Sequence, residues 1–228
     1  MGAMASVSAL RRAALPLAAV AVLAFVAGCG GGVDIEGADS TNARFASIPQ
    51  HGITLGADDA TLTMTEFADL QCPFCRRFDV NAMPTIVERY VRPGKLRIVF
   101  RSLAFLGDDS VRGARMAGAV GLQNHLFEFA DLFFENQGEE NSGYADDDFL
   151  RALAEAIPGV DADRAFSDRD RSEIDAQLAE ADSEADKWQV PGTPTFLLGP
   201  TGQEPSVLHI QSLEADAFVG PIDAMLAK

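Results

Sequence analysis

Two repeating patterns of apolar and polar residues alternate along most of the chain. Alternation at every second residue is typical of a half-buried strand, and recurrence every three or four residues is typical of a helix. The first pattern predicts strands at residues 60–66, 95–103, 196–198 and 207–211. The second predicts helices at residues 76–91, 109–136, 144–157, 161–169, 171–188 and 213–228. The order is strand, helix, strand, a block of helices, two strands and a closing helix, which indicates the α/β class.

The first 28 residues have a pattern of their own. Arg11 and Arg12 are their only charged residues, and an apolar run at 13–27 follows, interrupted only by Pro16. A basic start, a short apolar stretch and a small-residue exit are typical of a secretory signal peptide. The run is shorter than the roughly 20 residues that a spanning helix needs. An uncleaved signal anchor is the alternative interpretation.

The residues after this segment are rich in glycine and small polar side chains. This composition predicts a flexible tether at residues 29–47. We therefore expect a signal peptide at 1–28, the tether, and one folded domain at 48–228. The block of helices would form an insertion in that domain at about 108–189.

Composition and charge narrow the possible functions. The 228 residues are 47% hydrophobic and 23% charged, which fits a globular protein. They include 34 acidic and 18 basic residues, for a formal charge of -16. Such acidity argues against nucleic acid as a partner and against electrostatic attachment to anionic lipid.

Cys72 and Cys75 form a CxxC motif at the end of a predicted strand and the start of a predicted helix. Pro73 falls at the first helical position, where its missing N–H costs nothing. The partial positive charge of the helix N-terminus favours a thiolate at Cys72 and makes it a good nucleophile. Cys75 lies one turn further along the helix, where its thiol can resolve a mixed disulfide. The motif therefore indicates thiol–disulfide exchange.

Two other interpretations of the motif remain. A zinc site would need two more ligands, and the three histidines do not have paired spacing, so we expect no metal. A purely structural disulfide would close a very small loop and would stabilise the fold little. We expect no cofactor other than the redox-active Cys72–Cys75 disulfide.

The stretch EFADLQCPFC at 66–75 resembles the active-site segment of the DsbA family of thiol–disulfide oxidoreductases. The stretch VPGTPTF at 190–196 resembles that family's cis-proline loop, with Pro194 as the cis-proline and Thr193 before it. The resemblance covers about residues 50–228. It implies a thioredoxin fold with an inserted helical domain, and a loop at Thr193 and Pro194 that binds an extended substrate beside the cysteines.

The resemblance also suggests roles for neighbouring residues. Glu66 matches a position that often holds a buried acid assisting proton transfer to the second cysteine, and Arg97 is the candidate basic partner for it. Asp69 is nearer in sequence, but its simplest interpretation is a solvent-facing residue. Phe74 replaces the histidine of the founding DsbA enzymes, and we expect a less oxidising pair as a result. An exposed Phe74 would help to bind unfolded substrate.

The segment Val26-Ala27-Gly28-Cys29 resembles the lipobox of bacterial lipoproteins. That resemblance implies cleavage before Cys29 and lipid attachment to its sulfur, which would hold the protein on a membrane without a spanning helix. Cleavage would remove two arginines and leave 16 basic against 34 acidic residues, a charge of -18.

Together these observations predict an extracytoplasmic, lipid-anchored, monomeric thiol–disulfide oxidoreductase. Its partners would be cysteine-containing exported proteins and a membrane redox protein that recycles the dithiol. Export favours the oxidising direction, because disulfides persist outside the cytosol. Two alternatives stay open: a reductase or isomerase that uses the same dithiol, and a lipid-anchored binding or chaperone-like module with an inert disulfide.

Overall fold

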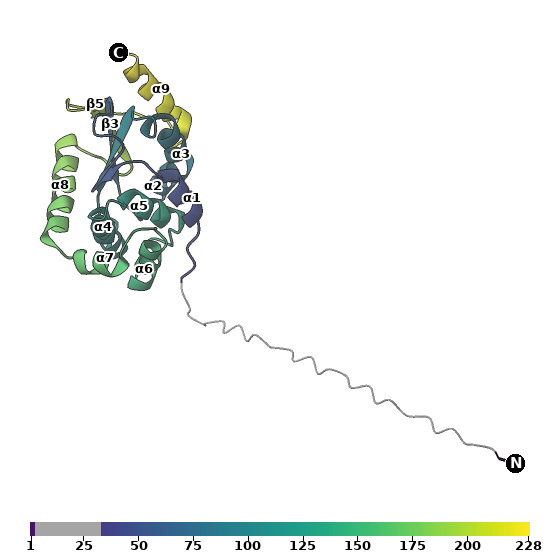
Figure 1. Cartoon of the computed structure of the whole chain (residues 1–228). Helices are drawn as coiled ribbons and strands as arrows, with labels where there is room; N and C mark the ends of the chain where they lie inside the picture. Colours follow the sequence, from purple (N-terminus) through teal and green to yellow (C-terminus); the bar gives the residue numbers. More distant parts are fainter. Residues whose placement is uncertain (3–32) are drawn as a thin grey trace. The chain divides into compact units, whose positions relative to one another are not determined.

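The computed structural model describes residues 1–2 and 33–228, and its residues from 33 onward are built around a mixed β-sheet (Figure 1). The strand order is β1-β2-β4-β3-β5-β6. Central β3 runs parallel to β4 and antiparallel to β5, and the remaining pairs are antiparallel. The strands are β1 (Gln50–His51), β2 (Thr54–Leu55), β3 (Leu62–Ala68), β4 (Leu96–Ser102), β5 (Thr195–Pro200) and β6 (Ser206–Val207).

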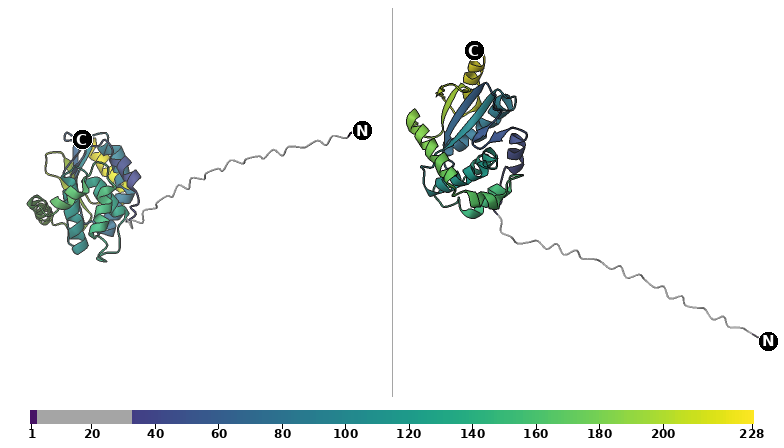
Figure 2. Two further views of the ribbon diagram at one scale, coloured as in Figure 1. Left: turned by 60° about the horizontal axis from the view of Figure 1, so that its bottom comes forward. Right: turned by 60° about the vertical axis from the view of Figure 1, so that its left-hand side comes forward.

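Helices cover the sheet and form a separate layer at one end of the domain. Of those between β4 and β5, the first four lie together at the end opposite the C-terminus, and the last runs along one side of the sheet (Figures 1 and 2). They are α4 (Asp108–Gly121), α5 (Leu126–Glu135), α6 (Asp147–Glu155), α7 (Ala162–Asp168) and α8 (Ser172–Trp188). The others are α1 (Ala38–Phe45), α2 (Pro73–Asn81), α3 (Met83–Ile86), the π-helix η1 (Val87–Val91) and α9 (Ala215–Leu226). This is the α/β arrangement of a thioredoxin fold with a helical insertion.

Three aromatic rings join the active-site helix to the sheet and to the last helix. Phe78 on α2 packs against Phe196 on β5 and Phe218 on α9, with ring centroids 4.5 and 4.9 Å away. All three side chains are fully buried. Aromatic pairs at such separations contribute beyond their area of burial. The cluster therefore fixes α2, which begins directly after Cys72, against the sheet.

Several predicted elements have different limits in the structure. The helix after Cys72 begins at Pro73, as predicted, but the stretch to Val91 is divided into α2, α3 and η1. The predicted helix at 109–136 is interrupted after Gly121, and Asn124 adopts a positive φ of 63° in the connecting turn. The last strand is short, because only Ser206–Val207 pair with β5. The short strands β1 and β2 were not predicted at all.

The predicted tether is wrong for its C-terminal half. Residues Ala38–Phe45 form helix α1, with Thr41 and Phe45 buried. Phe45 packs near Phe127, with ring centroids 6.3 Å apart, and Thr41 donates a hydrogen bond to Asp131 on α5. This aromatic side chain and this buried hydroxyl are among the contacts that attach the polar segment to the domain. The predicted signal peptide and Cys29 lie outside the described residues.

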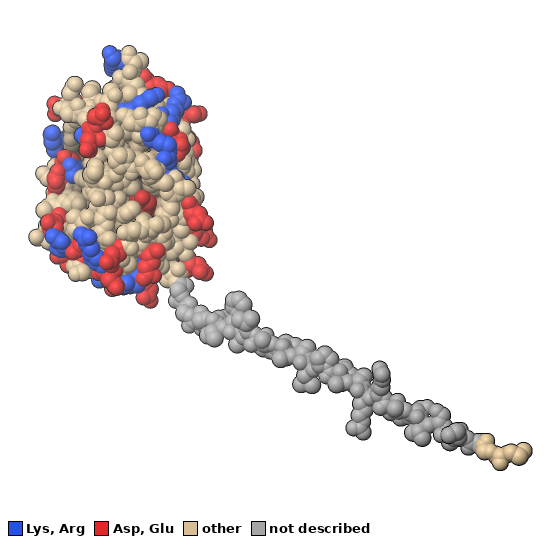
Figure 3. Space-filling view, in the orientation of Figure 1, with Lys and Arg blue, Asp and Glu red and all other residues tan. Residues whose placement is uncertain are grey.

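The surface carries charges of both signs. On the face shown in Figure 3 they lie mainly toward the two ends, and the middle is largely uncharged. Many arginines form ion pairs, such as Arg169 with Asp147 and Arg151 with Asp163. This face has no continuous basic patch. Within the described residues, no helix combines the length and the apolar character that crossing a membrane requires.

Candidate active site

Cys72 lies at the N-cap of α2, at the point where the chain leaves β3 and turns into the helix. Pro73 follows at the start of the helix, as predicted. The Cys72 side chain is 5% exposed, whereas Cys75, one turn further on, is completely buried. Both residues carry thiols in this structure. The position places the Cys72 sulfur at the positive end of the helix and beside the domain surface.

The surroundings of the two sulfurs shift their pKa values in opposite directions. The pKa of Cys72 falls to about 6, chiefly because the Cys75 thiol donates a hydrogen bond to its sulfur. The Thr193 side chain and the backbone N–H groups of Cys75 and Phe74 contribute further hydrogen bonds. The pKa of Cys75 rises well above its ordinary value, mainly through burial. Near neutral pH, the pair therefore consists of a slightly exposed thiolate at Cys72 and a fully buried thiol at Cys75.

The loop before β5 closes over Cys72 from the other side. The Thr193–Pro194 peptide bond is cis, as the resemblance implies. The backbone carbonyl of Thr193 lies 3.3 Å from the Cys72 Sγ, close enough to accept a hydrogen bond from the thiol. Residues separated by more than a hundred positions in the sequence thus meet at one sulfur.

Asp69 holds the loop that leads into Cys72, and the prediction that it faces solvent is wrong. Its carboxylate is completely buried. It accepts hydrogen bonds from the backbone N–H of Gln71, Phe105 and Leu106 and from the Ser110 hydroxyl, at 2.5–3.1 Å. Three of these four donors come from the loop after β4 and from α4. The start of the helical insertion therefore fixes the backbone that leads into the motif.

Gln137 and Arg76 provide a second set of supports that the sequence did not reveal. Gln137, just after α5, donates to the carbonyl oxygens of Leu70 and Cys72 at 2.8 and 3.3 Å. Arg76 on α2 donates to the Phe134 carbonyl at 2.8 Å. No sequence pattern marks either residue, because each acts through a backbone group distant in the chain.

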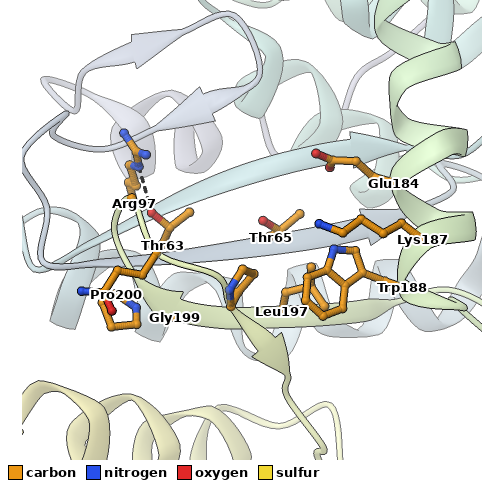
Figure 4. A pocket seen from close by; sticks show the side chains of 12 residues that line it. Thr63, Thr65, Arg97, Glu184, Lys187, Trp188, Leu197, Gly199 and Pro200 are labelled. Atoms are coloured by element: carbon orange, nitrogen blue, oxygen red, sulfur yellow. Dashed lines mark hydrogen bonds between the residues drawn. The ribbon is translucent and has the colours of Figure 1, made fainter.

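Glu66 is buried on β3, as the resemblance suggests, but its predicted basic partner is wrong. Glu66 and Arg97 point to opposite faces of the sheet: Thr63 is the register partner of Arg97, and side chains alternate along a strand. Arg97 donates to the Thr63 hydroxyl at 2.9 Å, at the pocket of about 240 Å³ seen in Figure 4. The Glu66 Oε1 has no hydrogen-bond partner. Burial, followed by the charge of Cys72, raises the pKa of Glu66 to about 8.

Comparisons with known proteins agree with this geometry. A family model described as Thioredoxin matches residues 49–207. The chain is 31% identical over 160 residues to a probable disulfide bond formation protein D of Bacillus cereus, covering 69% of this chain and 73% of that protein. The chain belongs to the DsbA-like thioredoxin family. It is a thiol–disulfide oxidoreductase.

Solved structures share the DsbA-like fold. Oxidised BdbD from Bacillus subtilis superposes with a TM-score of 0.67 and 21% identity, covering 79% of this chain and 98% of that one. Wolbachia pipientis alpha-DsbA1 gives a TM-score of 0.65 and 23% identity, with 81% and 96% covered. At these identities the similarity to the two solved structures supports a shared fold and nothing more specific.

Beside its cysteines, the DsbA-like domain presents an exposed ring and a groove. Phe74, inside the motif, is 59% exposed, and its ring faces solvent rather than the core. A groove of about 400 Å³ borders Pro194 and continues past Trp188 and Leu208 to His209. Both features adjoin the residues that meet at Cys72, because Phe74 belongs to the motif and Pro194 follows Thr193. Among residues 33–228, no group of three or more metal-ligating side chains is found.

Proposed function

We propose that this DsbA-like protein is exported, anchored to the membrane, and forms disulfides in extracytoplasmic proteins through Cys72 and Cys75. A substrate thiolate attacks the Cys72 sulfur, the bond to Cys75 breaks, and a mixed disulfide forms. The second substrate thiol then attacks the substrate sulfur of that mixed disulfide. The products are an oxidised substrate and a reduced enzyme with both cysteines free of partners.

The opposite environments of the two sulfurs are the observation that carries this proposal. A thiol with a pKa of about 6 is mostly ionised near neutral pH and is also a good leaving group. Cys72 is the sulfur nearer the surface, so it is the one that a protein substrate reaches. Buried Cys75 is reserved for closing the disulfide.

The oxidising direction follows from the same contacts. Hydrogen bonds that stabilise the Cys72 thiolate stabilise the reduced form of the pair, and the disulfide is therefore more readily reduced by a substrate. Relatives at 24–31% identity bear the name disulfide bond formation protein D, which supports this direction. A membrane redox partner would reoxidise the dithiol.

Substrate would bind as an extended segment beside the cis-proline loop. The Thr193 carbonyl next to the Cys72 sulfur is placed to accept a backbone hydrogen bond from such a segment. Exposed Phe74 and the groove along Pro194 offer apolar contact without a charge requirement. This arrangement suits unfolded chains that present a cysteine in a variable sequence. The protein would act as a monomer.

The location rests on the sequence of the first 29 residues. A signal peptide at 1–28 would export the chain, and acylation of Cys29 would hold it on the membrane. Residues 30–37, which precede α1, would separate the domain from the lipid surface. With Cys29→Ser, the protein should move from the membrane fraction to the soluble envelope fraction. Unchanged membrane association of that variant would contradict the anchor.

A trapping experiment tests the exchange mechanism. The Cys75→Ala variant cannot resolve a mixed disulfide, so it should accumulate covalent complexes through Cys72 in cells. Mass spectrometry would identify the partners, and Cys72→Ser is the matched control that should trap none. The absence of complexes with Cys75→Ala, or equal thiol-oxidation activity in wild type and Cys72→Ser, would exclude catalysis by this pair.

A further inference from the structure

Three carboxyl groups are buried in the core behind the cysteines, an unusual concentration for a small domain. Glu66 lies on β3, Asp79 on α2 and Asp131 on α5, and each is at most 4% exposed. An uncompensated buried carboxyl is costly, and buried acids are normally fully hydrogen-bonded. Here the Glu66 Oε1 and the Asp79 Oδ2 have no hydrogen-bond partner among the described residues. Such a set needs a reason other than stability.

The three groups are neighbours, and the first of them lies near the buried sulfur. Glu66 is close enough to Cys75 for its charge to raise the pKa of that thiol. Asp79 follows Cys75 by four residues on α2, so the two side chains lie on the same face of the helix. The charge of Glu66 also acts on Asp79. The first two carboxyls are therefore both neighbours of Cys75, one from β3 and one from its own helix.

The series continues from Asp79 toward the surface. The carboxyls of Asp79 and Asp131 are hydrogen-bonded to each other, which requires that one of them carries a proton. Asp131 also accepts hydrogen bonds from Thr41 and Arg44 on α1. The Arg44 side chain is partly exposed. Helix α1 thus forms the point at which the buried series meets solvent.

We propose that Asp79 and Asp131 extend Glu66 into a proton relay that connects Cys75 with solvent at helix α1. The inference rests on the exchange function proposed above. Asp79 and Asp131 touch no substrate, so they are positioning residues that act through Glu66.

Each exchange step requires one proton at Cys75. When a substrate thiolate attacks Cys72, the bond between the two cysteine sulfurs breaks and the Cys75 sulfur receives the electron pair. Because this sulfur is completely buried, a proton from Glu66 neutralises it, and Asp79, Asp131 and solvent replace that proton in turn. In reoxidation the proton moves outward: Cys75 loses it and attacks the mixed disulfide at Cys72, and the partner leaves as a thiolate.

The protonation states suit both directions. Burial raises the pKa of Glu66 to about 8, and burial followed by the charge of Asp131 raises that of Asp79 well above its usual range. The charged and titratable groups facing Asp79 are Glu66 from β3, Asp131 from α5 and Arg44 from α1, with Cys75 one turn away on its own helix. Burial raises the pKa of Asp131 too, but Arg44 and the Thr41 hydroxyl oppose that shift, so we place the shared proton on Asp79. Within this pair Asp79 is therefore the proton donor and Asp131 the acceptor.

The test separates the two steps of oxidation of the reduced protein by glutathione disulfide. Cys72 attacks first and releases one glutathione, and Cys75 then closes the disulfide and releases the second. Asp79→Asn and Asp131→Asn should slow the closing step by about tenfold or more, the lower range of general acid–base effects. The first step should be unchanged, because it uses only the Cys72 thiolate. Acid-quenched samples analysed by mass spectrometry give both rates.

Glu128→Gln is the matched control. Glu128 is a buried carboxylate on the same helix as Asp131, but it is bound by Gln50 and His125 and does not contact the relay. Its variant should close at the wild-type rate. Asp79→Asn should also keep or raise the unfolding temperature, because it removes a buried carboxyl that lacks a full set of partners. A residue needed only for structure would instead lower the unfolding temperature and leave the ratio of the two rates unchanged.

A measurement on the wild type keeps the test independent of the variants. If several protons move in the closing step, its rate should depend on the deuterium fraction of the solvent along a curve rather than a straight line. A straight line, or wild-type closing rates in both folded aspartate variants, would overturn the relay. An absent closing step in the wild type itself would instead overturn the proposed exchange function.

Discussion

Cys72 and Cys75 lie three residues apart, yet their sulfurs have opposite acid–base properties. The difference arises from contacts that the helix start and the cis-proline loop provide at Cys72 and from burial at Cys75. Hydrogen bonds to the sulfur stabilise the thiolate, while burial opposes any charge. The reactivity of the two cysteines therefore depends on the hydrogen bonds to the Cys72 sulfur and on the burial of Cys75.

The Cys72 thiolate should titrate with a midpoint near pH 6 in the reduced protein. In Cys75→Ala, the midpoint should move upward toward the ordinary value of a thiol, because the hydrogen bond from Cys75 is the largest cause of the shift. Thiolate absorbance or the pH dependence of alkylation measures both midpoints. An equal midpoint in the two proteins would show that the helix start and Thr193 suffice.

Glu66 should make the reduced protein less stable as pH rises. In the unfolded chain this carboxyl loses its proton near pH 4.5, but in the folded protein it does so only near pH 8. The folded state therefore binds more protons between these values, and the free energy of unfolding falls through that window. A shift of this size corresponds to a loss on the order of 5 kcal/mol.

Glu66→Gln should remove that loss. The difference in unfolding free energy between the variant and the wild type should grow in favour of the variant from pH 4.5 to pH 8. Denaturant unfolding of the reduced proteins at several pH values measures it, with exposed Glu88→Gln as the control. A difference that does not vary with pH would mean that Glu66 is ionised in the folded protein.

At the scale of elements, helix α1 shows how a polar segment becomes part of a domain. Its sequence, ADSTNARF, contains one large apolar residue, Phe45, which is 2% exposed. The helix also brings Thr41 and Arg44 to the buried Asp131. An element that lacks a periodic apolar face is thus held by one large aromatic side chain together with polar contacts.

Phe45→Ala should destabilise the protein by about 3–5 kcal/mol, as expected for truncation of a fully buried aromatic side chain. Phe74→Ala, which truncates the same side chain at an exposed position, should change stability by less than about 0.5 kcal/mol. Denaturant unfolding of the oxidised proteins compares the two. Equal effects would mean that α1 detaches from the domain in solution.

At the scale of the whole molecule, the fold determines the redox potential by bringing β3, α2 and the loop before β5 to one sulfur. A Cys72 pKa of about 6 lies between the values of about 7 in thioredoxin and about 3.5 in DsbA. The reduction potential should accordingly lie between about -270 and about -120 mV. Equilibration with glutathione measures it, and a value near that of thioredoxin would favour the reductase alternative.

Phe74→His should make the pair more oxidising. A protonated imidazole at this position would add positive charge beside the Cys72 thiolate, where the aromatic ring provides none. Each unit by which the pKa of Cys72 falls should raise the reduction potential by about 30 mV. The potential and the thiolate midpoint should therefore change together, and a variant in which only one of them changed would contradict this coupling.

The sequence alone determined the elements whose signals are local. The CPFC motif after an alternating run located the start of α2, and the GTPT stretch located the cis-proline loop, because turn and cap chemistry depend on neighbouring residues. The α/β order and the helical block between β4 and β5 followed from apolar periodicity. The family resemblance also placed Glu66 in the interior.

Only the tertiary structure decided which distant residues meet. Arg97 seemed the natural partner of Glu66, but the two side chains point to opposite faces of the sheet, and Asp79 is a neighbour of Glu66 instead. Asp69 and Gln137 hold the active-site loop through backbone groups that carry no sequence signature. Strand register and helix packing set these contacts, and both depend on the whole chain rather than on any local pattern of residues.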